Sequence, residues 1–112
     1  MTRDEALAAV LRETATAHAA RASGNEGMVR VCARRAAGAA LAWWLQEHPR
    51  PAWGTDAVGR LRGLAGEADR PADVRAAARR LTARVSAGFE APHREDPLED
   101  CRTVTAHLFG GG

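Results

Sequence analysis

The clearest pattern in the sequence is a run of ten residues, 36–45, that contains no polar side chain. It follows an arginine-bearing stretch that begins after Asn25, a residue typical of helix N-caps. A helix that is apolar on all sides needs other helices around it. The pattern therefore predicts a central helix over 26–47, ended by Pro49, in a small all-helical protein.

Apolar residues at helical spacing predict a first helix over 3–22. It begins at a Thr2–Glu5 capping box and stops before Gly24. Because the following turn is short, this helix should lie antiparallel to the central one. Its apolar stripe consists of Leu7, Val10, Leu11, Thr14, Ala17 and His18. We expect His18 to be partly buried and hydrogen-bonded.

Three further helices follow a loop at 49–55. A short one begins after Thr55 or Asp56 and is weakened by three glycines. The next has Pro71 in its first turn and Gly88 as its stop. The last begins at Asp96–Pro97, an N-cap followed by a first-turn proline, and continues through Leu108.

These elements predict an all-α fold, an up-and-down bundle of four long helices plus one short helix. The whole chain, 1–112, forms a single domain with a disordered tail at 110–112. Alanine is so frequent at inward positions that larger side chains must supply much of the hydrophobic stabilisation. These are Leu41, Trp43, Trp44, Leu45, Leu61 and Leu81. Trp53 lies in a loop and is expected to be an exposed contact.

Composition changes this picture little. All 16 basic residues are arginine, and the net charge of +2 is too small to indicate nucleic-acid binding. The charged N-terminus lacks the apolar core of a signal peptide, and the run at 36–45 is too short to cross a bilayer. We therefore expect a cytoplasmic protein without a membrane partner. Cys32 and Cys101 form no C-x-x-C pair, so we expect reduced thiols, with no metal and no cofactor.

The layout resembles the HEPN (higher eukaryotes and prokaryotes nucleotide-binding) domains. Four features carry the likeness: an alanine-rich first helix, a Gly24–Asn25 turn, alanine pairs within 32–38, and a final helix after a loop. The resemblance extends from about Leu7 to Leu108. It implies a helical bundle that tends to form homodimers, in some members beside a nucleotidyltransferase.

In two places the chain departs from that family. Many members carry a lysine near the end of the second helix and a histidine at the start of the third. Here those regions read 43–45 (WWL) and 58–60 (VGR). Functions that depend on those two positions are therefore in doubt.

One branch of the family consists of metal-independent ribonucleases with an arginine, four to six spacers and a histidine on the last helix. Arg102 and His107 match this spacing. By this resemblance His107 would act as general acid or base on a ribose 2′-hydroxyl, while Arg102 would stabilise charge on the phosphate. The two lie about 140° apart around a helix, so a site would need a second protomer. Such pairs also arise by chance: Arg12 and His18 have a matching spacing on the first helix.

Four arginines of the fourth helix form i,i+4 pairs that repel one another unless an anion compensates them. They are Arg75, Arg79, Arg80 and Arg84. Internal carboxylates of the segment 90–100 could pair with them. Alternatively, they form a phosphate-binding face for a nucleotide or RNA. No aromatic residue interleaves them as a stacking platform would require.

Two hypotheses follow. The first is a dimerising HEPN-like binding or assembly module for a nucleotide, RNA or protein partner. The alternative is a metal-independent ribonuclease with a composite Arg102 and His107 site at a homodimer interface.

Overall fold

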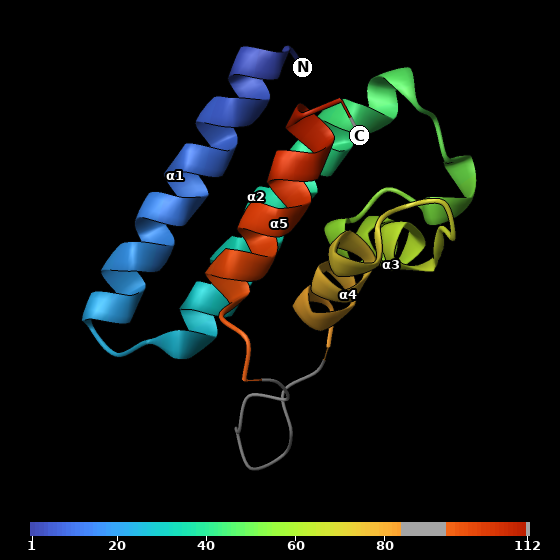
Figure 1. Ribbon diagram of the computed structural model, residues 1–112. Coiled ribbons are helices and arrows are strands. Elements are labelled where there is room, and N and C mark those ends of the chain that lie inside the picture. The colour runs from blue at the N-terminus through green and yellow to red at the C-terminus, as the bar shows by residue number, and fades with distance from the viewer. Residues whose placement is uncertain (84–93, 112) are drawn as a thin grey trace.

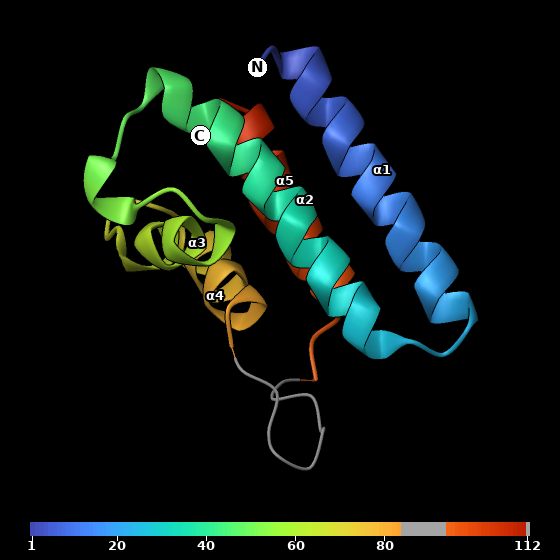
Figure 2. The same cartoon turned by 180° about the vertical axis from the view of Figure 1, so that it is seen from behind.

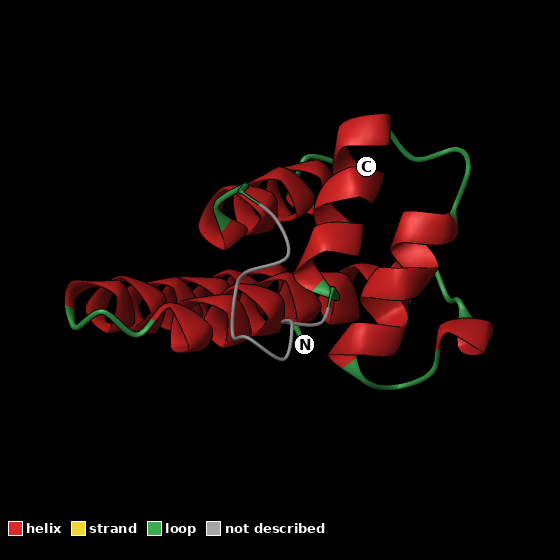
Figure 3. Cartoon of the chain, turned by 90° about the horizontal axis from the view of Figure 1, so that it is seen from below, coloured by secondary structure: helices red, strands yellow, loops and turns green. Residues whose placement is uncertain are grey.

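The computed structural model describes residues 1–83 and 94–111, and within them it is all-helical and free of strands (Figures 1 and 3). The helices are α1 (Arg3–Ala22), α2 (Glu26–Glu47), α3 (Ala57–Gly66), α4 (Ala72–Leu81) and α5 (Pro97–Phe109), with a short 3₁₀ turn η1 (Pro51–Trp53). The all-α prediction is confirmed, as are the bounds of the first two helices.

The central position of α2 determines the arrangement. α1, α3 and α5 all pack on α2, while α4 packs on α3 and α5. Figures 1 and 2 show α1 on one side of the molecule, α3 and α4 on the other, and α2 and α5 between them. α1 and α2 are antiparallel neighbours, as expected, and Gly24 in their turn has a φ of 78°.

Short polar side chains start four of the helices, as the sequence indicated. Thr2 and Glu5 form a capping box at α1. Asn25, Asp56 and Asp96 each accept a hydrogen bond from a backbone N–H in the first turn of α2, α3 and α5. Local sequence therefore fixes these starting points.

The core has α2 at its centre, and its largest side chains are close to those expected. Leu41, Trp44, Leu61 and Leu81 are buried. Trp43 and Leu45 are only partly buried and lie at the margin of the core. Trp43 contacts the ring of Phe109, with centroids 4.9 Å apart.

The expectations for Trp53 and His18 were wrong. The Trp53 ring is partly buried because it lies directly on Gly63, whose lack of a side chain leaves room for it. The Arg50 guanidinium covers that ring, 5.6 Å from its centroid. His18 is exposed rather than partly buried.

α4 is shorter than the sequence pattern suggested, since it ends at Leu81 instead of continuing to Gly88. Two arginines of α2 donate to the carbonyl oxygens at this end. Arg30 Nη2 reaches the carbonyls of Arg80 (3.4 Å) and Ala83 (3.1 Å), and Arg34 Nε reaches that of Leu81 (3.0 Å). These donors satisfy carbonyls that would otherwise require another helical turn.

The expected set of four long helices and one short one is therefore wrong. α3 and α4 have 10 residues each, whereas α1, α2 and α5 have 20, 22 and 13. The last part of the predicted fourth helix, 84–88, lies outside the described residues.

We predict that Gly38→Ala lowers the free energy of unfolding by about 1–2 kcal/mol, because overpacking outweighs the gain in helix propensity. A Cβ at Gly38 would lie 2.8 Å from the Cβ of Ala57, where α2 and α3 cross. Gly66→Ala is the matched control, since its Cβ would meet nothing within 4 Å. Urea denaturation of both variants measures the difference, and equal stabilities would contradict the proposed close approach.

Candidate functional site

Arg102 and His107 line one open depression between the start of α4 and the middle of α5. The depression is completed by Pro71, Asp73 and Val74 of α4 and by Thr103 and Ala106 of α5. Although the two side chains lie on different faces of an ideal helix, both reach this depression. The structure thus brings together the pair that the sequence singled out.

His107 is held in a state suited to accept a proton. Its ring is partly buried, and its Nε2 is buried without a hydrogen-bond partner among the described residues. Burial lowers the pKa of His107, and the nearby positive charge of Arg70 lowers it further, while Asp73 opposes the shift. The imidazole is therefore neutral at neutral pH. Because Nε2 is covered, a substrate could reach it only after a local movement.

Arg102 is available to an anion. Its side chain is 75% exposed, and its ion pair with Glu99 is long at 3.7 Å. An exposed ion pair of this kind contributes little stability, so Arg102 can exchange Glu99 for another anion at little cost in free energy. One protomer therefore offers an exposed, weakly paired cation and a neutral histidine on the same depression.

The α4 arginines do not form one free basic face among the described residues. Arg75 Nε donates to the carbonyl oxygen of Ala65, at the end of α3. Arg80 makes a forked contact with the buried Asp100, with Nη2 and Oδ1 2.8 Å apart. The predicted internal pairing with the acidic segment is thus confirmed for Arg80. Arg79 is exposed, and Arg84 lies outside the described residues.

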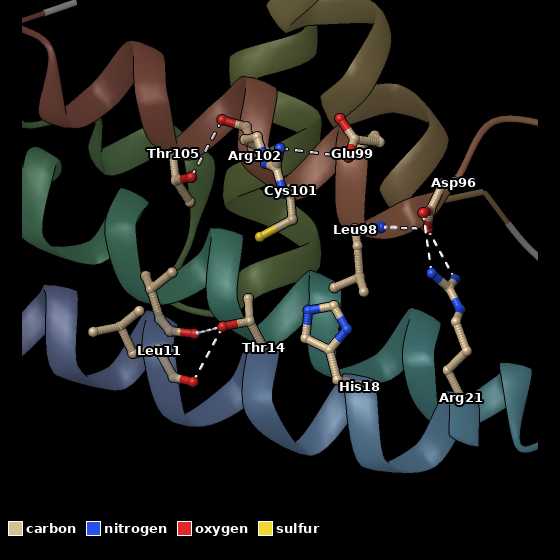
Figure 4. Close-up of a pocket in the computed structure, with 11 residues that line it drawn as sticks. Leu11, Thr14, His18, Arg21, Asp96, Leu98, Glu99, Cys101, Arg102 and Thr105 are labelled. Atoms are coloured by element: carbon tan, nitrogen blue, oxygen red, sulfur yellow. Dashed lines mark hydrogen bonds and ion pairs between the residues drawn. The ribbon is translucent and has the colours of Figure 1, made fainter. Parts of the chain in front are cut away.

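A second concavity, a groove of about 280 Å³, lies between α1 and α5. Both helices pack on α2 but not closely on each other. In Figure 4, Leu11, Thr14 and His18 of α1 lie opposite Leu98, Cys101 and Thr105 of α5. The groove is therefore walled by two helices, with α2 behind it.

The groove leaves part of the apolar stripe of α1 without a neighbour. Ala6, Ala17 and Ala20 are buried against the rest of the protein. Leu11, which belongs with Ala17 to the predicted stripe, is 68% exposed at the edge of the groove. The sequence analysis missed this groove, although the width of the stripe was a usable signal: one neighbouring helix could not cover it.

One end of the groove is closed by ion pairs. Arg21 donates to both oxygens of Asp96, at 2.9 and 3.0 Å, and also contacts Glu26. The hydrogen bonds from Arg21 lower the pKa of Asp96. The pair joins the end of α1 to the start of α5 and so fixes the separation of the two walls there.

Both thiols are buried and unpaired with each other. Cys101 lines the groove, is only 1% exposed, and has its pKa raised by burial to about 11. Burial likewise raises the pKa of Cys32. Both groups are therefore protonated at neutral pH and unreactive.

Comparisons with known proteins add no identification, since no family model, curated protein or solved structure matches the chain. Among residues 1–83 and 94–111, no group of three or more His, Cys, Asp or Glu could hold a metal ion. Within the same residues, none of the helices has the length and apolar character needed to cross a membrane.

We predict that His107 titrates below about 6.5, the ordinary histidine value. The cause is burial beside Arg70. Because the unfolded chain binds this proton more readily than the folded protein, protonation of His107 opposes folding as the pH falls below that value. A titration of the imidazole C–H signals by NMR, assigned with His107→Gln, measures the midpoint. A midpoint at or above 6.5 would contradict the placement of the ring.

Proposed function

We propose that the protein is a dimerising helical assembly module whose contact surface is the groove between α1 and α5. The observation that carries this proposal is Leu11, a leucine 68% exposed at the edge of a hollow on the same molecule that both apolar and polar side chains line. A surface with both a projecting leucine and a hollow can match a second copy of itself. A second copy is therefore the occupant to which the proposal commits.

The HEPN-like character of the bundle is part of this proposal. It is supported by the short turn at Gly24–Asn25, the alanines in the middle of α2, and the final helix α5, which carries Arg102 and His107. A nucleotide or RNA ligand and a cytoplasmic location stay predictions. Of the arginines that the sequence singled out, Arg79 and Arg102 are the exposed cations that such a ligand would meet first.

We predict that Leu11→Glu converts a dimer into a monomer, because the contact would lose the apolar area of Leu11 and would have to bury a carboxylate in its place. Size-exclusion chromatography with light scattering across a protein concentration series gives the oligomeric state. Met28→Glu is the matched control, since Met28 is also an exposed large apolar residue, at 38%, but does not line the groove. A wild-type protein that stays monomeric at all concentrations would overturn the proposed function.

A second candidate function, metal-independent ribonuclease, is favoured by one specific observation: Arg102 and His107 line the same open depression. In this reaction a neutral His107 would take the proton of a ribose 2′-hydroxyl as that oxygen attacks the adjacent phosphorus. Arg102 would stabilise the negative charge that develops on the phosphate. A composite site would further require a second protomer to approach this α4–α5 side of the molecule.

For the ribonuclease, we expect cleavage of single-stranded RNA in the presence of a chelator, reduced at least tenfold by His107→Ala and by Arg102→Ala. Arg12→Ala is the matched control, because Arg12 forms the equivalent chance pair with His18 on α1, is exposed and does not line the groove. Gel analysis of labelled RNA measures the rates. Absence of cleavage by the wild-type protein, or equal rates in all variants, would exclude this function.

A further inference from the structure

We propose that Arg70 is a positioning residue for His107, holding its ring with the proton on Nδ1 so that an N–H donor faces the α4–α5 depression. The inference goes beyond the assembly module and does not depend on the dimer. It rests on the depression that Arg102 and His107 share. It states which ring nitrogen a ligand would meet and which half-buried residue decides this.

Three buried polar atoms on the closed side of the depression lack hydrogen-bond partners among the described residues. They are Glu67 Oε2, Arg70 Nε and His107 Nε2. Buried polar groups in folded proteins are nearly always hydrogen-bonded, so these atoms call for an explanation. An arginine Nε–H can only donate, whereas a neutral histidine accepts at Nε2 when its proton is on Nδ1. Arg70 and His107 therefore suit each other in that tautomer, through a small side-chain rotation or one bridging water.

The charges around the ring favour the same tautomer. Arg70 and Asp73 both act on the His107 ring, in opposite directions. Asp73 lines the depression, whereas Arg70 does not. With Nε2 covered, Nδ1 is the ring nitrogen left to face the depression. The positive charge of Arg70 attracts a lone pair on Nε2, and the carboxylate of Asp73 attracts a proton on Nδ1.

The contacts of Arg70 restrain it on the closed side of His107. Its side chain is only 19% exposed, and its Nε lies 3.7 Å from Glu67 Oε2, too far for a hydrogen bond. Its guanidinium covers the Trp44 ring, 5.3 Å from the centroid. The other oxygen of Glu67 accepts hydrogen bonds from Arg50 at 2.9 and 3.1 Å. These contacts hold the guanidinium in place and leave its Nε–H unused.

This tautomer determines what His107 can do for a ligand. Nδ1–H and the exposed guanidinium of Arg102 are both hydrogen-bond donors, so the depression would offer two donors to the oxygens of a ligand. The nitrogen that could take a proton from a ribose hydroxyl, Nε2, faces away from it. In the ribonuclease candidate the ring would therefore have to turn over before His107 acts as a base.

Long-range ¹H–¹⁵N NMR of the full-length protein, labelled with ¹⁵N-histidine, shows which ring nitrogen carries the proton. At about pH 8 a histidine with the ordinary pKa of about 6.5 is neutral, and so is His107, whose pKa is lowered. His48 is the internal reference for the Nδ1–H form, because its Nδ1 lies 3.0 Å from the carbonyl oxygen of Trp44, which can only accept. The exposed His18 is the reference for a solvated ring, and His107→Gln assigns the signals.

We expect His107 to match His48 in the wild-type protein. In Arg70→Met its signals should move towards the pattern of His18, because methionine removes the donor and the charge while keeping an apolar stem beside Trp44. Arg75→Met is the matched control, since Arg75 is also half-buried and its Nε donates to the carbonyl oxygen of Ala65. This control should leave the His107 tautomer unchanged.

A wild-type His107 with its proton on Nε2 would overturn the inference and would make Glu67 Oε2 the acceptor of that proton. A tautomer that Arg70→Met leaves unchanged would overturn the role of Arg70. If the methionine variant does not fold, Arg70→Lys repeats the test, because it keeps the charge but places a methylene where Nε–H stands. A shift in the same direction is expected, and no shift would again overturn the role. The dimer and RNA cleavage are tested separately, by light scattering and by the gel assay.

Discussion

The enclosure of α2 from its middle to its C-terminal end is the constraint on which the other elements depend. Ala33, Ala36, Ala37 and Ala40 are completely buried, so neighbouring helices approach the α2 backbone closely. Trp44, near the C-terminal end of this segment, is only 2% exposed. The His48 ring stacks on the Trp44 ring with centroids 4.2 Å apart, and the guanidiniums of Arg50 and Arg70 each lie 5.3 Å from the Trp44 ring centroid. α1, α3 and α5 all pack on α2, and α4 is connected to it mainly through α3 and α5. Loss of this enclosure would therefore destabilise the packing of every other helix.

Several arginines of this chain serve as internal hydrogen-bond donors. Arg30 and Arg34 satisfy carbonyls at the end of α4, and Arg75 does the same at the end of α3. Arg80 neutralises Asp100, which is only 5% exposed. A guanidinium suits these roles because it presents several donors in a fixed plane on a long stem. The arginine count therefore says little about phosphate binding, and the exposed Arg79 and Arg102 are more informative than the total.

Sequence predicted the features that depend on local interactions and missed those that depend on distant ones. Caps such as Asn25 and Asp96 are local, so the starts of α2 and α5 could be placed to the residue. The end of α4 could not, because the donors that satisfy it come from α2, about 50 positions earlier in the chain. In the same way, an apolar stripe shows that α1 has neighbours but not how many, so the exposure of Leu11 and His18 was not foreseen. Arg102 and His107 were singled out by their spacing on the last helix and the family resemblance, whereas the burial of Nε2 depends on packing that spacing cannot show.

The two proposed activities place different demands on the same helix, α5. Arg102 lines both the groove and the α4–α5 depression, and so lies on the ridge that separates them. His107 lines the depression but not the groove. A dimer formed through the groove would therefore bring the partner close to Arg102, while His107 would lie outside that contact. A composite site across such a contact would lack His107, so any RNA cleavage would have to come from each protomer alone.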